Sequence, residues 1–122
     1  MTLSTSKLSR IPGVQAIFLF GSQVTGEAGP LSDVDICVIA PGVSEYYKSE
    51  ILGSANENTD IVLFEDLPLP IKARIFREGR LLFCRNKEWV ADLSWRTTKE
   101  YFDFKPILKE FIEMYLPGVE YV

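Results

Sequence analysis

The sequence has no histidine and only two cysteines, Cys37 and Cys84, among its 122 residues. The missing histidine excludes a Ser-His-Asp or Cys-His catalytic triad, a His-ligated zinc and an imidazole general base. Both cysteines lie in apolar runs, which is typical of buried, reduced thiols rather than of a disulfide framework. Any chemistry in this chain therefore depends on Asp, Glu, Lys, Tyr and bound metals.

The chain also lacks a long apolar run and a long basic run. No stretch approaches 18 consecutive apolar residues, and the polar segment 1–10 has no apolar core of a signal peptide. The net charge is -4, and no Lys or Arg run offsets it, so the chain as a whole repels a phosphate backbone. We expect a cytoplasmic protein that neither enters a membrane nor binds nucleic acid directly.

The length and the composition, 47% hydrophobic and 25% charged, are those of one globular domain over residues 1–122. Short apolar or β-branched runs predict strands at 14–20, 33–39, 60–64 and 80–84. Capping residues, Pro and Gly predict helices at 44–53 and 70–78, and a helical region from 88 in which Pro106 begins a second helix ending at 116. Strands that alternate with helices predict an α/β fold, with the C-terminal helices as part of the same domain.

Asp33 and Asp35 open the second predicted strand. Side chains two apart on a strand share a face, so both carboxylates lie on one side, with Val34 and Ile36 on the other. Two such charges repel, and a cation between them would relieve the repulsion. Because the donors are all oxygen, Mg²⁺ or Mn²⁺ is the expected metal. The alternative is that Asp33 is a turn residue and Asp35 an exposed residue of an edge strand.

Gly21 and Ser22 follow directly after the first predicted strand. A glycine there lets the backbone approach a ligand, and the next amides can face an anion such as a triphosphate. The ten residues 23–32 then return the chain to Asp33, which is enough for a loop between adjacent strands. The sequence thus predicts that a phosphate-binding turn and metal-binding carboxylates meet.

Asp60 opens the third predicted strand, DIVLF, and offers a third carboxylate if that strand lies beside the second. Two metals held by three carboxylates can stabilise both the attacking and the leaving oxygen of a displacement at phosphorus. Asp60 would then bind the metal nearest the acceptor hydroxyl and act as its general base. The alternative is that Asp60 only caps the strand.

The motif FLFGSQVTGEAGPLSDVDICVI, followed by DIVLF, resembles the DNA polymerase β-type nucleotidyltransferase superfamily. More narrowly, DIVLFEDLPLPIKARIFREGRLLFCRN and KEYFDFKPILKEFIEMY are similar to the minimal nucleotidyltransferase (MNT) antitoxins of HEPN/MNT toxin-antitoxin systems. The resemblance implies a mixed β-sheet with helices packed on one face. It also implies a two-metal Mg²⁺ site in which Mn²⁺ can substitute, ATP as donor, and transfer of AMP to a tyrosine of a cognate HEPN ribonuclease toxin that the antitoxin binds.

By position in the family motif, the resemblance implies that Gly21 and Ser22 hold the nucleotide phosphates. It implies that Asp33 and Asp35 bind both metals and Asp60 the catalytic one. One position departs from the pattern, because members often have Arg or Lys where this chain has Thr25. A weak or inactive antitoxin that acts by binding alone is therefore an alternative, as is a nucleotidyltransferase for a small molecule of the aminoglycoside type.

Two further groups of residues have open roles. Four basic residues surround the helix at 70–78 and most simply form a solvated face, although one of them can replace the missing charge at Thr25: Lys72, Arg74, Arg77 and Arg80. An apolar stripe on the last helix most simply covers the sheet and otherwise docks a partner: Phe104, Leu108, Phe111 and Tyr115.

Overall fold

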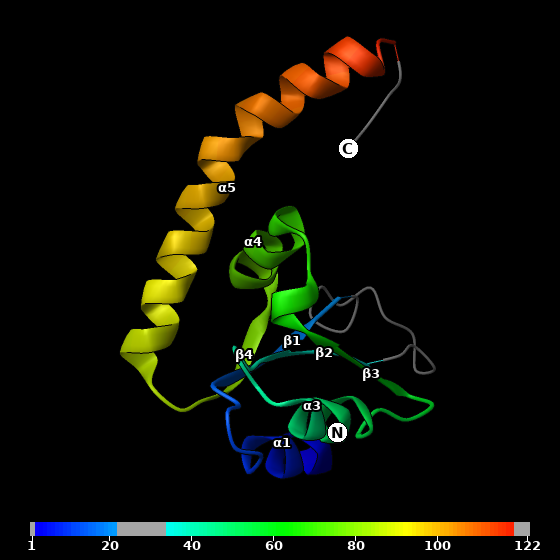
Figure 1. Ribbon diagram of the computed structural model, residues 1–122, viewed down its shortest axis with the longest axis vertical. Coiled ribbons are helices and arrows are strands. Elements are labelled where there is room, and N and C mark those ends of the chain that lie inside the picture. Colours follow the sequence, from blue (N-terminus) through cyan, green and yellow to red (C-terminus); the bar gives the residue numbers. More distant parts are fainter. Residues whose placement is uncertain (1, 22–33, 119–122) are drawn as a thin grey trace.

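The structure is a computed structural model that describes residues 2–21 and 34–118 (Figure 1). The described strands form one sheet in the order β3-β2-β1-β4. Strand β1 is antiparallel to both β2 and β4, whereas β2 and β3 are parallel. The strands are β1 Ala16–Phe20, β2 Val34–Ile39, β3 Thr59–Leu63 and β4 Arg80–Cys84. The predicted mixed sheet is confirmed, and each predicted strand lies within two residues of an observed one.

The helices are α1 Thr2–Ser9, α3 Glu45–Leu52, α4 Leu69–Glu78 and α5 Lys87–Tyr115, with a short 3₁₀ helix η1 at Phe64–Asp66. The predicted α3 is confirmed with its cap, because the Ser44 side chain accepts a hydrogen bond from the Tyr47 N–H at 3.3 Å. Helix α4 begins with a proline in its first turn and ends at Gly79, as expected. Helix α1 was not predicted, since its sequence TLSTSKLS has almost no apolar periodicity.

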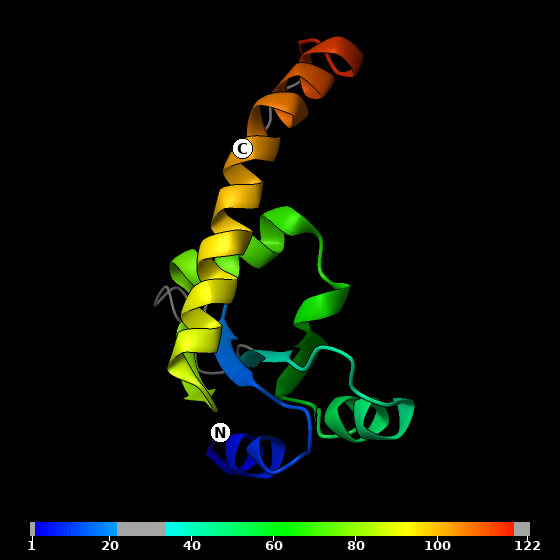
Figure 2. The ribbon, with the colours of Figure 1, turned by 60° about the vertical axis from the view of Figure 1, so that its left-hand side comes forward.

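Both faces of the sheet are covered by helices. On one face, Leu8 of the N-terminal segment and Ile51 of α3 pack with Ile17 and Ile36 of the sheet. On the other face, α4 and α5 pack over residues such as Phe18 (Figures 1 and 2). The expectation that helices pack on one face is therefore wrong in this detail. Strands β1 and β2 are apolar on both sides, so each face needs a cover.

Helix α5 runs without a break through Pro106, so the prediction that Pro106 begins a second helix is wrong. Its neighbours are good helix formers, and the helix continues past the lost hydrogen bond as a curved rod (Figures 1 and 2). The first half of α5 packs on α4, with Val90 and Thr97 buried. The second half projects from the body (Figure 1).

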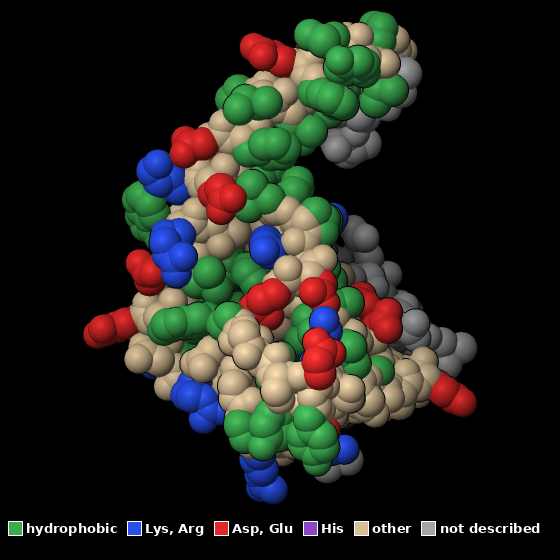
Figure 3. Space-filling model, viewed as in Figure 1, with side chains coloured by type: hydrophobic (Ala, Val, Ile, Leu, Met, Phe, Trp, Pro, Cys, Tyr) green, Lys and Arg blue, Asp and Glu red, His purple; other side chains and the backbone are tan. Residues whose placement is uncertain are grey.

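The projecting half of α5 carries large apolar side chains in contact with water, which Figure 3 shows as a green patch at its end. Phe111 and Tyr115 of the apolar stripe are 57% and 64% exposed. The simplest expectation for that stripe, that it covers the sheet, is therefore wrong. In the part of the chain that the structure describes, no helix has the length and apolar character needed to cross a bilayer. Cys37 and Cys84 are free thiols.

Candidate functional site

Gly21 lies at the end of β1, against the carboxylate of Asp35 on β2. Its φ of +86° belongs to the left-handed region that glycine adopts without strain. A Cβ built on Gly21 would collide with Oδ2 of Asp35. The last residue of β1, Phe20, pairs with Asp35 in the antiparallel register, which brings the turn to this carboxylate. The predicted meeting of the glycine turn with an aspartate of the second strand is thus present for Gly21 and Asp35.

Asp35 and Asp60 occupy paired positions on the parallel strands β2 and β3. Side chains at paired positions point to the same face, and adjacent strands lie about 4.8 Å apart. The face is the one that α4 covers, because Cys37, two residues after Asp35, belongs to the core under that helix. Asp60 is exposed and Asp35 is partly exposed, so water and a ligand can reach the pair. The condition set by the sequence, that the third strand adjoin the second, is met.

Ser22, Thr25 and Asp33 lie outside the described residues, and their predicted roles stay predictions. Within residues 2–21 and 34–118 no three Cys, Asp or Glu side chains come together as a metal site. The two described carboxylates, Asp35 and Asp60, offer only oxygen donors from neighbouring strands. This donor set fits Mg²⁺, which binds through one or two carboxylates together with water and substrate phosphates.

A pocket of about 180 Å³ opens beside Gly21, between the end of β1 and α4. Its walls are the apolar side chains of Phe20, Ile71 and Ile75, and its charged members are Arg74 and Glu78, both on α4. Sites for small ligands are typically apolar with a few charged groups, as here, but usually measure about 300–1,000 Å³, so this pocket would hold only part of such a ligand. The pocket adjoins the turn that the sequence assigned to phosphates.

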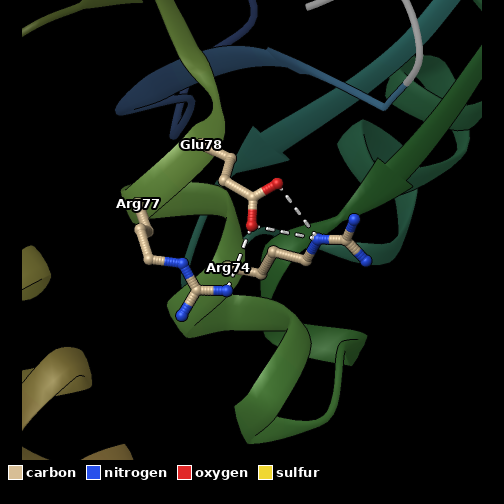
Figure 4. Close-up of polar contacts among 3 residues, drawn as sticks. All are labelled: Arg74, Arg77 and Glu78. Carbon is tan, nitrogen blue, oxygen red and sulfur yellow. Dashed lines mark hydrogen bonds and ion pairs between the residues drawn. The ribbon is translucent and has the colours of Figure 1, made fainter. Parts of the chain in front are cut away.

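The charged residues at the end of α4 are paired with one another (Figure 4). Arg74 Nε lies 3.3 Å and Arg77 Nη2 3.1 Å from Oε2 of Glu78. The hydrogen bond from Arg77, together with the charge of Arg74, lowers the pKa of the Glu78 carboxyl. Of the four basic residues that the sequence left unresolved, Arg74 lines the pocket, whereas Lys72 lies over the Phe64 ring at 5.2 Å.

Sequence reasoning missed Glu78 and the apolar walls of this pocket. The signal that could have found them is the helical spacing of Ile71, Arg74, Ile75 and Glu78, which places these residues on one face of α4.

A family model described as "Polymerase beta, Nucleotidyltransferase" matches residues 5–88. The chain belongs to this nucleotidyltransferase family. Its match contains β1 to β4 and α4, and so contains Gly21, Asp35, Asp60 and the pocket beside them. A protein of Methanocaldococcus jannaschii, provisionally named a protein adenylyltransferase, is 40% identical over 97 residues, which are 80% of this chain and 77% of that protein.

Solved structures share the nucleotidyltransferase fold over nearly the whole chain. A toxin-antitoxin crystal structure with AMP-PNP matches with a TM-score of 0.72 and 21% identity, covering 91% of this chain and 94% of that one. A complex of a tri-AMPylated Shewanella oneidensis HEPN toxin with its MNT antitoxin matches with a TM-score of 0.66 and 17% identity, covering 92% and 95%. The fold of the described chain, including most of α5, is therefore that of these structures.

Proposed function

We propose that this nucleotidyltransferase is an antitoxin that transfers AMP from ATP to a tyrosine of its cognate HEPN ribonuclease toxin and so neutralises it. The observation that carries the proposal is the paired position of Asp35 and Asp60 on adjacent parallel strands, with Gly21 against Asp35. The names of the relatives support the same reaction, since they include a protein adenylyltransferase and an AMPylated toxin bound to its antitoxin.

Asp33, Asp35 and Asp60 would hold one or two Mg²⁺ ions, and Gly21 and Ser22 would hold the nucleotide phosphates. When bound, the metal stabilises the negative charge that develops on the phosphoryl oxygens. Asp33 and Asp35 are two apart in the sequence, which is the reason to expect both carboxylates on one face. The all-oxygen donors of Asp35 and Asp60 support Mg²⁺ or Mn²⁺ over softer metals.

The proposed reaction is a displacement at the α-phosphorus of ATP. The tyrosine oxygen forms a bond to the α-phosphorus, the bond from this phosphorus to the α,β-bridging oxygen breaks, and pyrophosphate leaves. A tyrosine hydroxyl has an ordinary pKa near 10, so a base must take its proton at neutral pH. Asp60, which is exposed at the edge strand β3, would accept that proton.

The projecting half of α5 would bind the toxin. Four large apolar side chains on this part of the helix are each more than half exposed: Phe102, Ile107, Phe111 and Met114. Exposed apolar and aromatic side chains gathered in this way are typical of a protein interface. Two free cysteines agree with a reducing compartment, so we place the reaction in the cytoplasm.

The direct test is transfer of label to the purified toxin. With α-labelled ATP and Mg²⁺, we expect label on the toxin, and with γ-labelled ATP we expect none, because the γ-phosphate leaves with pyrophosphate. Peptide mapping should place the label on tyrosine, and a metal chelator should prevent the transfer. Absence of toxin labelling with α-labelled ATP would show that the proposed activity is wrong.

A second function, neutralisation of the toxin by binding alone, is favoured by the exposed apolar side chains of α5. The two functions are separated by an Asp33→Asn, Asp35→Asn double variant expressed together with the toxin. If transfer is essential, this variant no longer protects cells. Full protection by the double variant would favour the binding function. Transfer of AMP to an aminoglycoside instead of the toxin would favour the small-molecule alternative.

A further inference from the structure

Two charged residues of α4, Arg74 and Glu78, line the pocket beside Gly21, and Gly21 itself lies against Asp35. Arg74 is the basic residue among the side chains that line this pocket. Its guanidinium contacts Glu78 through Nε, at 3.4 Å from Oε1 and 3.3 Å from Oε2. Figure 4 shows the two Nη atoms on the far side of the guanidinium, directed away from Glu78. These atoms are placed to donate hydrogen bonds to a ligand.

A polyphosphate that enters this site also meets negative charge. Asp35 and Asp60 are carboxylates, and the sequence from 22 to 33, which includes Thr25, contains no Lys or Arg. The planar fork of an arginine matches phosphate oxygens in geometry and charge better than a lysine does. If the phosphates of a nucleotide lie beside Gly21, the basic side chain of this pocket that can contact them is Arg74 of α4.

We propose that Arg74 binds the β- and γ-phosphates of the nucleotide. Its positive charge would replace that of the Arg or Lys that family members often have where this chain has Thr25. The proposal rests on ATP as the donor in the proposed function. Glu78 occupies Nε and leaves both Nη atoms for the ligand. Because the β- and γ-phosphates leave as pyrophosphate, a cation on them also stabilises the leaving group.

Arg77 is the matched control that distinguishes phosphate binding by Arg74 from an ordinary surface ion pair with Glu78. It also contacts Glu78, and its side chain is 61% exposed, compared with 62% for Arg74. It does not line the pocket. If the α4 charges only stabilise the helix end or attract anions in general, Arg74→Ala and Arg77→Ala should have the same effect.

The test is calorimetric titration of the whole chain, without toxin, with ATP and with AMP in the presence of MgCl₂. We expect Arg74→Ala to weaken ATP binding by about tenfold or more, as for a lost charge-assisted hydrogen bond. AMP binding by Arg74→Ala and ATP binding by Arg77→Ala should stay within about twofold of wild type. Because the side chains of Arg74 and Arg77 are exposed, both variants should unfold at the wild-type temperature, which would show that their fold is intact.

Equal ATP affinity of wild type and Arg74→Ala would overturn the proposal, and so would equal losses for Arg74→Ala and Arg77→Ala. An equal loss for ATP and AMP would also overturn it, since the contact would then not be to the β- and γ-phosphates. Each of these results leaves label transfer to the toxin unaffected as a separate test of the proposed function. A wild-type chain that binds no ATP would instead contradict the proposed donor and this assignment with it.

Discussion

At the scale of single residues, the site depends on a glycine for two reasons that can be measured apart. Gly21 has a positive φ, and it also leaves room for Oδ2 of Asp35 where a Cβ would collide. Gly42 has a similar φ of +70° but nothing within 4 Å of the position of its missing Cβ. The two glycines therefore differ mainly in the carboxylate.

We expect Gly42→Ala to lower the free energy of unfolding by about 1 kcal/mol, the cost of a left-handed conformation for alanine. Gly21→Ala should cost at least about twice that, because Asp35 must also move, and it should weaken ATP binding. Urea unfolding followed by circular dichroism measures the free energy of unfolding of both variants. Calorimetric titration measures the ATP affinity of Gly21→Ala. Equal stabilities of the two variants would show that the close approach has no energetic consequence.

Cys37, two residues from Asp35, belongs to the core and not to the site. Its side chain, on β2, is fully buried in the core cluster under α4. Burial, with a smaller effect of the Glu65 charge, raises the pKa of its thiol from 9.0 to about 12. The thiol thus stays protonated in the folded chain at pH values where the unfolded chain loses its proton.

This shift makes stability depend on pH in the alkaline range. Between pH 9 and 12 the folded state holds one more proton than the unfolded state, so the free energy of unfolding falls as pH rises. The contribution of Cys37 has a maximum slope of about 1.4 kcal/mol per pH unit. The difference in slope between wild type and Cys37→Ala, measured by urea unfolding at several pH values, isolates it from other titrating groups. Parallel pH profiles would contradict the burial of this thiol.

At the scale of elements, the local sequence pattern predicted where the strands lie, but only the structure shows which strands pair with one another. The alternation in DVDICVI and the stop at Gly79 suffice to place β2 and the end of α4. The pairing of Asp35 with Asp60 depends on the parallel register of β2 with β3, which no local signal contains. For the same reason the sequence could not single out Arg74 among the four basic residues of this region and missed Glu78, because packing of α4 against β1 brings both to Gly21.

Helix α5 shows the limit of reading a proline as a boundary. Pro106 removes one hydrogen bond, but the helix continues on both sides of it from Lys87 to Tyr115. The apolar stripe most simply predicted a face that covers the sheet, and this was wrong because half of the helix extends beyond the body (Figure 2). An apolar pattern alone does not distinguish a core face from an interface.

We expect Phe111→Glu to change the free energy of unfolding by less than about 0.5 kcal/mol, since the side chain is 57% exposed. The same change should weaken binding to the toxin by more than about tenfold, because it places a charge in an apolar interface. Glu110→Ala, one residue away and exposed, is the matched control and should bind normally. Surface-based binding measurements with immobilised toxin test both variants. Wild-type affinity of Phe111→Glu would contradict a docking role for this part of α5.

At the scale of the whole molecule, the two activities that we propose occupy separate regions. The family match at 5–88 contains the sheet, the aspartate pair and the pocket beside Gly21, whereas the exposed apolar residues of the projecting helix lie beyond it on α5. The contact between α4 and the first half of α5 joins the two regions, and the second half of α5 projects from the body (Figure 1). Changes in one region should therefore leave the chemistry or the affinity of the other largely intact.

The central claim is that Asp35 and Asp60 together form the centre of nucleotidyl transfer. The most direct measurement is the initial rate of label transfer from α-labelled ATP to the toxin by wild type, Asp35→Asn, Asp60→Asn and the control Asp92→Asn. Asp92 is an exposed aspartate of α5 that pairs with Arg96 at 2.8 Å, far along the chain from the site. We predict that each site variant loses about 100-fold or more in rate while Asp92→Asn keeps the wild-type rate. Wild-type rates for Asp35→Asn and Asp60→Asn would contradict the claim.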